Sequence, residues 1–263
     1  MLCVGYKAAG ASPYCDAGYA LPAAGVSAIL VHGESDPIRA ADVQTKLEST
    51  GAFTSVSVFN AYQGTPSLSL LQQCTVAFVF RLGGFQSTTG LGDVLAQYWD
   101  GGGAVVVAFN AVITLNEGRF GTALNGYILL DTAGTDDSSL NTLGTLIEPQ
   151  SPLLIGVTSL TASYYRSTGA VINGGVVVAR WSSGYPLVVR KFRNGRPLVE
   201  LNMWPPSSDV DGSSWRGNGV ALMRNALLYA SCVKSNAGAN DAAGENLVCD
   251  QDGGLAMATI FMP

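Results

Sequence analysis

The stretch WDGGGAVVVAFNAV, residues 99–112, decides the fold class. Its three consecutive glycines end the preceding stretch TTGLGDVLAQYWD, in which apolar residues recur at helical spacing. The run AVVVAF that follows is apolar throughout, which is typical of a strand buried on both faces of a parallel sheet. This strand ends at Asn110, where several α/β folds present a nucleophile or a ligand-binding histidine. We expect Asn110 to cap the turn that leaves the strand by bonding to backbone groups.

The alternation of strand-like and helix-like segments extends upstream. The runs VSAILVH (26–32), FTSVSVFN (53–60) and TVAFVFRL (75–82) predict three further buried strands. IRAADVQTKLESTG (38–51) predicts a helix between the first two of them, ended by its final glycine. Because strand–helix–strand units join parallel strands, the sequence predicts a parallel sheet with helices on both faces.

The pattern changes downstream of Asn110. Residues 114–150 are rich in Gly, Thr, Asn and Asp, and we expect them to form a long excursion over one edge of the sheet. Three strand-like runs then follow with tight turns between them: GGVVVARW (174–181), YPLVVRKF (185–192) and RPLVELNMW (196–204). The Asn-Gly pair at 194–195 is a strong hairpin signal. A final helix is expected in NGVALMRNALLYASC, residues 218–232.

Together these segments predict an α/β fold, a flavodoxin-like three-layer sandwich. Its mostly parallel central sheet is extended by C-terminal antiparallel hairpin strands. We expect a single α/β domain at residues 25–233, preceded by a cysteine-containing segment (1–24) and followed by a loop-rich tail (234–263).

Composition excludes several classes of function. The chain is 48% hydrophobic and 13% charged with a net charge of −5, and it has no basic cluster beyond RKFRNGR (190–196). Nucleic-acid binding through a basic face is therefore not expected. The longest apolar runs are too short to span a bilayer, and no signal peptide is visible at the start. With one histidine and no C-x-x-C motif, we expect neither a metal site nor a cofactor.

The five cysteines suggest two local disulfides. Cys3 and Cys15 flank a small-residue loop near the start, and Cys232 and Cys249 flank a Gly/Asn/Ala-rich stretch near the end. We predict the pairs Cys3–Cys15 and Cys232–Cys249, because each would tie down one end of the chain. Cys74 is predicted to be a free buried thiol. Disulfides favour an extracellular or cell-surface location, with a cytoplasmic one as the alternative.

Several segments taken in order resemble the class I glutamine-amidotransferase-like superfamily, and within it the ThuA-like branch of the trehalose-utilisation type. The segments are LAQYWDGGGAVVVAF (95–109), SPLLIGV (151–157), YPLVVRKFRNGRPLVELNMW (185–204) and MRNALLYAS (223–231). The resemblance covers residues 26–231 and is carried by the order of the motifs more than by any one of them.

The departures from this family bear on activity. Positions at which ThuA-like chains often carry histidine are Asn110 and Ser151 here, and Asn202-Met203 replaces a Gly-His pair. A glutamine amidotransferase also needs a cysteine nucleophile at a strand–helix elbow, with a histidine partner later in the chain. Cys74 precedes its strand and His32 lies on the first strand, so neither fits. We therefore expect a divergent member that lacks the catalytic residues.

Candidate site residues lie where strands end, because ligands of open parallel sheets bind at the carboxyl ends of the strands. The candidates for ligand binding are His32, Glu34, Asp36, Arg81, Asn110 and Arg119. Glu34 and Asp36 beside a histidine and an arginine could perform general acid–base chemistry. The favoured interpretation of Asp36 is instead an N-cap ahead of Pro37. For Arg81, an ion pair with Glu34 or Asp36 is at least as well supported as a ligand contact.

The sequence thus predicts a non-catalytic domain that serves binding or assembly, with protein partners or self-assembly, inside a larger extracytoplasmic or surface protein. Two alternatives stay open. One is a divergent hydrolase or carbohydrate-active enzyme that uses Glu34, Asp36 and Arg81. The other is a small-ligand-binding module at the strand ends. Trp204 and Trp215, in WPPSSDVDGSSW, are a candidate platform for a carbohydrate, although aromatic anchors of a loop are the favoured interpretation.

Overall fold

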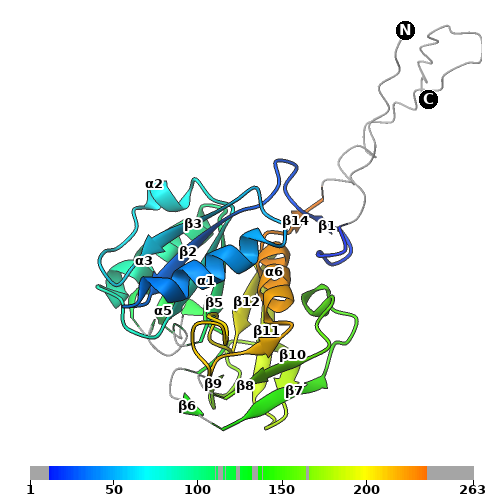
Figure 1. The fold of residues 1–263 in the computed structure, drawn as a ribbon. Helices are drawn as coiled ribbons and strands as arrows, with labels where there is room; N and C mark the ends of the chain where they lie inside the picture. Colours follow the sequence, from blue (N-terminus) through cyan, green and yellow to red (C-terminus); the bar gives the residue numbers. More distant parts are fainter. Residues whose placement is uncertain are drawn as a thin grey trace, which may run out of the picture.

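The structure, a computed structural model, describes residues 12–109, 111, 115, 117–122, 125–131, 136–137, 139–163 and 166–235 (Figure 1). A ten-stranded sheet runs through this part of the chain. Two short pairs lie outside that sheet: β1 (Tyr19–Ala20) with β14 (Val233–Lys234), and β6 (Asp136–Asp137) with β9 (Arg166–Ser167).

One half of the large sheet is parallel. Its strands are β2 (Ser27–Gly33), β3 (Ser55–Asn60), β4 (Val76–Arg81), β5 (Ala104–Ala108) and β12 (Arg196–Leu201). They lie in the order β3-β2-β4-β5-β12. β2, β3, β4 and β5 are the strands that the apolar runs predict. Every residue of β5, from 104 to 108, is buried.

The other half of the sheet is antiparallel. From β12 outward its strands are β11 (Pro186–Arg193), β10 (Val176–Trp181), β7 (Asn141–Leu146), β8 (Leu160–Ala162) and β13 (Arg216–Gly217). The β11–β12 hairpin turns at Asn194 and Gly195, whose φ angles are +51° and +73°. A two-residue turn of this kind needs positive φ at both positions, which Asn and Gly tolerate best.

The prediction of an α/β fold is confirmed, but the sheet is mixed instead of mostly parallel. Among the described residues it has four parallel and five antiparallel neighbour pairs. The difference arises because the chain between β5 and β10 contributes β7 and β8, and the chain after β12 contributes β13; these three strands extend the antiparallel half beyond β10.

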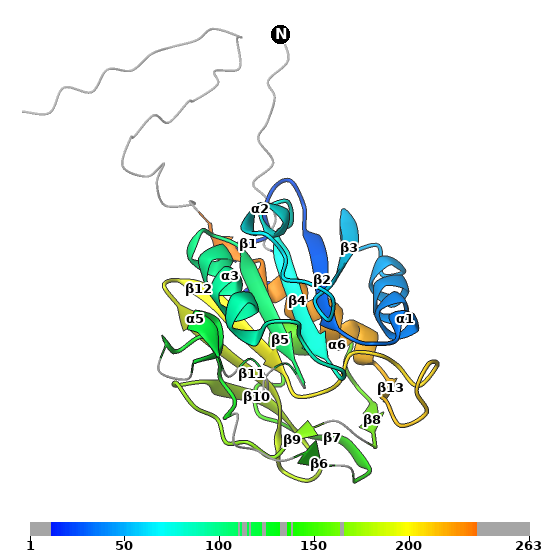
Figure 2. The same cartoon turned by 90° about the vertical axis from the view of Figure 1, so that its left-hand side faces the viewer.

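Helices cover both faces of the parallel half (Figure 2). α1 (Pro37–Glu48) and α6 (Gly219–Ala230) pack on one face; α2 (Leu68–Leu71), α3 (Thr88–Asp100) and α5 (Gly118–Gly121) pack on the other. A short 3₁₀ helix, η2 (Pro152–Leu154), lies against α6. Successive strand residues alternate between the two hydrophobic clusters, as in β4, where Phe78 faces α6 and Val79 faces α3.

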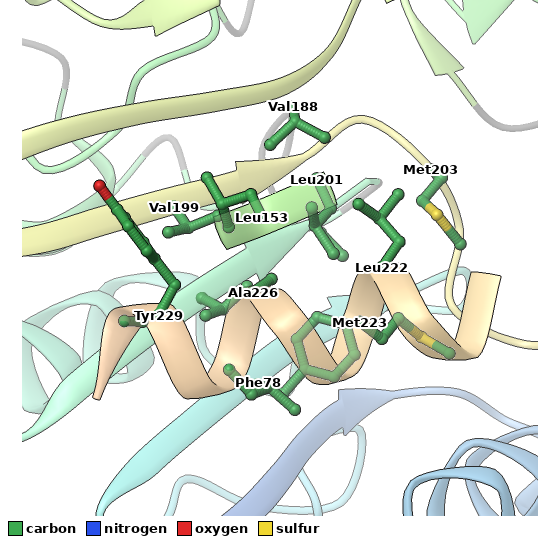
Figure 3. Close-up of a cluster of buried hydrophobic side chains, with 14 of the residues drawn as sticks. Phe78, Leu153, Val188, Val199, Leu201, Met203, Leu222, Met223, Ala226 and Tyr229 are labelled. Carbon is green, nitrogen blue, oxygen red and sulfur yellow. The ribbon is translucent and has the colours of Figure 1, made fainter. Parts of the chain in front are cut away.

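The cluster under α6 joins the two halves of the sheet. Leu222, Met223 and Ala226 of α6 are buried against Phe78 of the parallel half and Val188 of the antiparallel half (Figure 3). α6 contacts β4, β5 and β12, so it lies across the centre of the sheet.

The ends of the described chain are joined to each other. Cys15 and Cys232 form a disulfide with their Cα atoms 5.8 Å apart, and β1 pairs with β14. The predicted pairs Cys3–Cys15 and Cys232–Cys249 are therefore wrong. Proximity along the chain suggested them, whereas the end of α6 brings Cys232 beside the N-terminal segment. Cys3 and Cys249 lie outside the described residues.

Cys74 is free, as predicted, but half-buried instead of buried. The predicted division of the chain at residues 24 and 233 stays a prediction. No helix in the described part is both long and apolar enough to cross a bilayer.

Asn202, directly after β12, links β9 and β11 through hydrogen bonds of its side chain. Its Nδ2 donates to the carbonyl oxygens of Ser167 (2.8 Å) and Pro186 (2.7 Å), and its Oδ1 accepts from the Ser167 backbone N–H (2.7 Å). The residue is fully buried. Each of these bonds satisfies a backbone group that has no access to water, so Asn202 has a structural role.

Asn202→Ala should lower the free energy of unfolding by about 3 kcal/mol or more, because several buried polar groups would lose their partner at roughly 1–3 kcal/mol each. Urea unfolding followed by circular dichroism measures this. Asn60→Ala is the control, since the Asn60 side chain accepts one hydrogen bond, from the exposed Tyr62 N–H. Equal losses in the two variants would contradict the role of Asn202.

Candidate functional site

The carboxyl end of β2 carries a buried histidine. His32 is 2% exposed, and its Nδ1 accepts a hydrogen bond from the Glu34 backbone N–H at 3.2 Å. Burial lowers the pKa of His32 to about 4, so the imidazole is neutral at pH 7. Because an accepting ring nitrogen carries no proton, the proton is on Nε2. The ring stacks on Phe80 of β4, with the centroids 6.1 Å apart.

Glu34 is the most enclosed acid at this end of the sheet, with a side chain that is 0% exposed. Its Oε1 accepts from Nε1 of Trp204 at 3.0 Å, and its Oε2 lies 3.7 Å from the guanidinium of Arg39. Burial raises the pKa of the Glu34 carboxyl, and the contacts with Trp204 and Arg39 oppose that rise. Neither partner was predicted from the sequence: Arg39 lies on the first turn of α1, and Trp204 lies in the chain after β12.

Asp36 is the N-cap of α1, as its position before Pro37 predicts. Its Oδ1 accepts from the Ile38 backbone N–H at 3.0 Å, and its own backbone is extended. A carboxylate here satisfies one of the free N–H groups at the start of the helix and interacts favourably with the helix dipole. Asp36 therefore has a structural role at the start of α1.

Arg81, the last residue of β4, does not form the predicted ion pair with Glu34 or Asp36. The carboxylate of Glu34 attracts the Arg81 charge, but its ion-pair partner is Arg39. Arg81 is half-buried; its guanidinium lies over the Phe85 ring at 5.9 Å, and its Nε has no hydrogen-bond partner among the described residues. Burial lowers the pKa of Arg81 from its usual value. The prediction failed because α1 brings a second arginine to Glu34.

We call His32, Glu34, Arg39, Arg81 and Trp204 the strand-end cluster. Arg119 does not belong to it, because it pairs with Asp100 at the end of α3, with a distance of 2.6 Å between Nη2 and Oδ2. Asn110 lies outside the described residues. Within the described residues, no three His, Cys, Asp or Glu side chains come together in a way that could hold a metal ion.

A second buried acid, Glu200, lies inside the core and was also missed. Its carboxylate oxygens accept from the Leu129 and Leu130 backbone N–H groups, each at 2.8 Å. Burial raises the pKa of Glu200 to about 8, and the two hydrogen bonds act in the opposite direction. The only sequence signal was a single charge inside the apolar run PLVEL. Glu200 holds residues 129–130 against β12.

No protein-family model matches the chain, and no curated protein matches its sequence. The fold does match solved structures. A putative ThuA-like protein from Bacteroides uniformis superposes with a TM-score of 0.54 at 15% identity, over 85% of this chain and 94% of that one. Two proteins from Salmonella typhimurium described as cytoplasmic give TM-scores of 0.54 and 0.50 at 11% and 10% identity. Each match spans 76% of this chain, and they span 97% and 98% of those proteins.

The chain has a ThuA-like fold. Identities this low indicate a shared fold only, and any activity depends on the side chains of this chain.

Trp204→Phe should lower the free energy of unfolding by about 1–3 kcal/mol more than loss of ring volume explains, because a buried carboxylate loses a hydrogen bond. Trp99→Phe is the matched control: Trp99 is 1% exposed and Trp204 2%, but Nε1 of Trp99 has no hydrogen-bond partner in the part of the chain that the structure describes. Urea unfolding of both variants gives the comparison.

The effect of Trp204→Phe should also depend on Glu34 and on pH. The pKa of Glu34 is raised because the folded state disfavours its charged form. The free energy of unfolding therefore falls as the pH rises through that pKa and the carboxyl ionises. Trp204→Phe should therefore cost more at pH 8 than at pH 4, and Glu34→Gln should recover part of the loss. A loss that is independent of pH and unchanged by Glu34→Gln would contradict this account.

Proposed function

We propose that the chain is a non-catalytic amidotransferase-like domain that acts in binding or assembly within a larger extracellular or surface protein. The order β3-β2-β4-β5-β12 of the parallel strands supports a flavodoxin-like three-layer core. The divergence from catalytic relatives is part of the proposal, and it rests on the residues at the strand ends.

The burial of Glu34 carries the proposal. A general acid or base must reach the proton that it transfers. Glu34 is fully enclosed and engaged by Trp204 and Arg39, while the neutral His32 accepts a backbone N–H. Asp36 is engaged at the start of α1. The acids and the histidine that could have performed turnover thus serve the fold.

The Cys15–Cys232 disulfide supports the extracellular or surface location, because structural disulfides are rare in the reducing cytosol. Two structural neighbours are described as cytoplasmic, which favours the alternative. The disulfide is a property of this chain, whereas the cytoplasmic description belongs to proteins that are 11% and 10% identical to it. A role in assembly is supported by large apolar side chains on and beside the antiparallel strands: Leu140, Ile147 and Val176 are 69%, 50% and 45% exposed.

One observation favours the second candidate function, a small-ligand-binding module. Arg81 is a half-buried cation whose Nε has no hydrogen-bond partner and which forms no ion pair in the described part of the chain. A guanidinium in this state is suited to a ligand with a carboxylate or phosphate group. Binding of such a ligand would need no acid or base, so it is compatible with an absence of turnover.

Glutaminase and glycosidase assays on the purified protein should give rates no higher than those of Glu34→Gln, because Glu34 is enclosed. Asp36→Asn is the companion variant, which tests the exposed acid at the start of α1. Turnover that is lost in either variant, with the circular dichroism spectrum unchanged, would establish the hydrolase in place of the proposed function.

A further inference from the structure

The strand β3 forms one margin of the ten-stranded sheet. It pairs with β2 over six residues without a register shift, and in the described part of the chain no strand lies on its other side (Figure 2). Just after β3, the Ala61 backbone N–H donates to the His32 carbonyl oxygen in the same register. Because successive residues of a strand direct their N–H and C=O groups to opposite sides, Val56, Val58 and Asn60 direct theirs away from β2. β3 thus presents a row of backbone donors and acceptors along this margin.

β3 lacks the features by which edge strands usually avoid further pairing, which are charges, proline, bulges and short length. Residues 49–80 include no Asp, Glu, Lys, Arg or His, and this run contains β3, α2 and all of β4 except Arg81. Val58 and Tyr62 add apolar surface, with exposures of 39% and 48%. The opposite margin of the sheet differs, because β13 has two residues and one of them is the exposed Arg216. The β3 margin is therefore open to a further strand.

We propose that two copies of the chain pair through their β3 strands, antiparallel and about a two-fold axis at Val58, so that the two sheets become continuous. A two-fold axis sets a surface against the same surface of the second copy. Any charged residue near the axis would then face a like charge, which destabilises strand pairing. The chain has a net charge of −5, but its β3 margin is uncharged, so a second copy meets no like charge on this strand. This symmetry favours a second copy as the partner.

The backbone groups of β3 fit this register. At the axis, the N–H and C=O groups of Val58 bond to those of Val58 in the second copy, and Val56 lies opposite Asn60. The Val56 carbonyl oxygen already accepts from Gln44 Nε2 at 2.8 Å, and it has a second lone pair for the new strand. Gln44 also donates to the carboxylate of Glu48, which places an acid near Val56. The two-fold axis sets that acid beside Asn60 of the second copy and away from its own equivalent.

The exposed apolar side chains of the antiparallel half are less suited to such pairing. Val176 lies opposite Arg190 in the β10–β11 ladder, and Arg190 forms an ion pair with Glu148, at 2.8 Å between Nε and Oε2. Charged groups thus lie beside the apolar surface there, whereas β3 carries none. A dimer at β3 also goes beyond the proposed function, because it is compatible with either the presence or the absence of turnover.

Analytical ultracentrifugation of the full chain over a range of concentrations tests the dimer. We expect the unmodified chain to dimerise, and Val58→Lys to raise the dissociation constant by at least about 100-fold, because two ammonium groups would meet at the axis. Val176→Lys is the control, since Val176 is similarly exposed, at 45%, and should leave the dissociation constant unchanged. A chain that stays monomeric at every concentration would overturn the inference and leave the assays of turnover unaffected. A dimer that persists in folded Val58→Lys would overturn it as well.

Crosslinking tests the position of the axis without adding a charge. In a Cys74→Ser background, Val58→Cys should form an intermolecular disulfide on mild oxidation, because the Cα atoms of such a pair lie about 5.5 Å apart. The unreduced tryptic digest should then contain peptide 47–81 linked to a second copy of itself. Tyr62→Cys in the same background is the control: position 62 is on the same peptide and more exposed, but it lies away from the axis. Equal crosslinking at the two positions, or none at Val58→Cys, would overturn the proposed pairing.

Discussion

The hydrogen bonding of β12 is the constraint on which the rest of the structure depends. This strand pairs in parallel with β5 on one side and antiparallel with β11 on the other, so in the described part of the chain it joins the two halves of the sheet. Glu200 of this strand and Asn202, directly after it, make two further connections. Glu200 holds residues 129–130 by two N–H bonds, and Asn202 holds the segment at Ser167. β12 therefore joins the two halves of the sheet and, with Asn202 directly after it, positions the segments at residues 129–130 and 167.

The strand-end cluster also depends on β12. The chain leaving β12 places Trp204 where its indole N–H reaches Glu34, which follows β2. α1 adds Arg39, whose guanidinium also lies over the Trp204 ring at 5.0 Å. A carboxylate removed from water must be satisfied by such donors or become neutral. At the edge where open parallel sheets bind ligands, this chain thus connects the loop after β2 to the segment after β12.

Local patterns in the sequence predicted local structure well. The apolar runs placed β2 to β5, the Asn194-Gly195 pair placed the hairpin, and Asp36 before Pro37 placed the start of α1. What failed depends on contacts across long separations. The disulfide joins residues 217 positions apart, and Trp204 is 170 positions from Glu34. The expected partner of Arg81 was Glu34 or Asp36, because both follow a neighbouring strand end, whereas α1 brings Arg39 to Glu34.

The central claim is that the strand-end cluster serves the fold and not proton transfer, and its histidine offers a direct test. His32 is the only histidine in the chain, so one NMR signal reports its titration without assignment. The account predicts a pKa of about 4, with circular dichroism confirming the fold over the same pH range. A pKa near the unperturbed value of about 6.5 would show an accessible imidazole that charges near neutral pH, and it would contradict the claim.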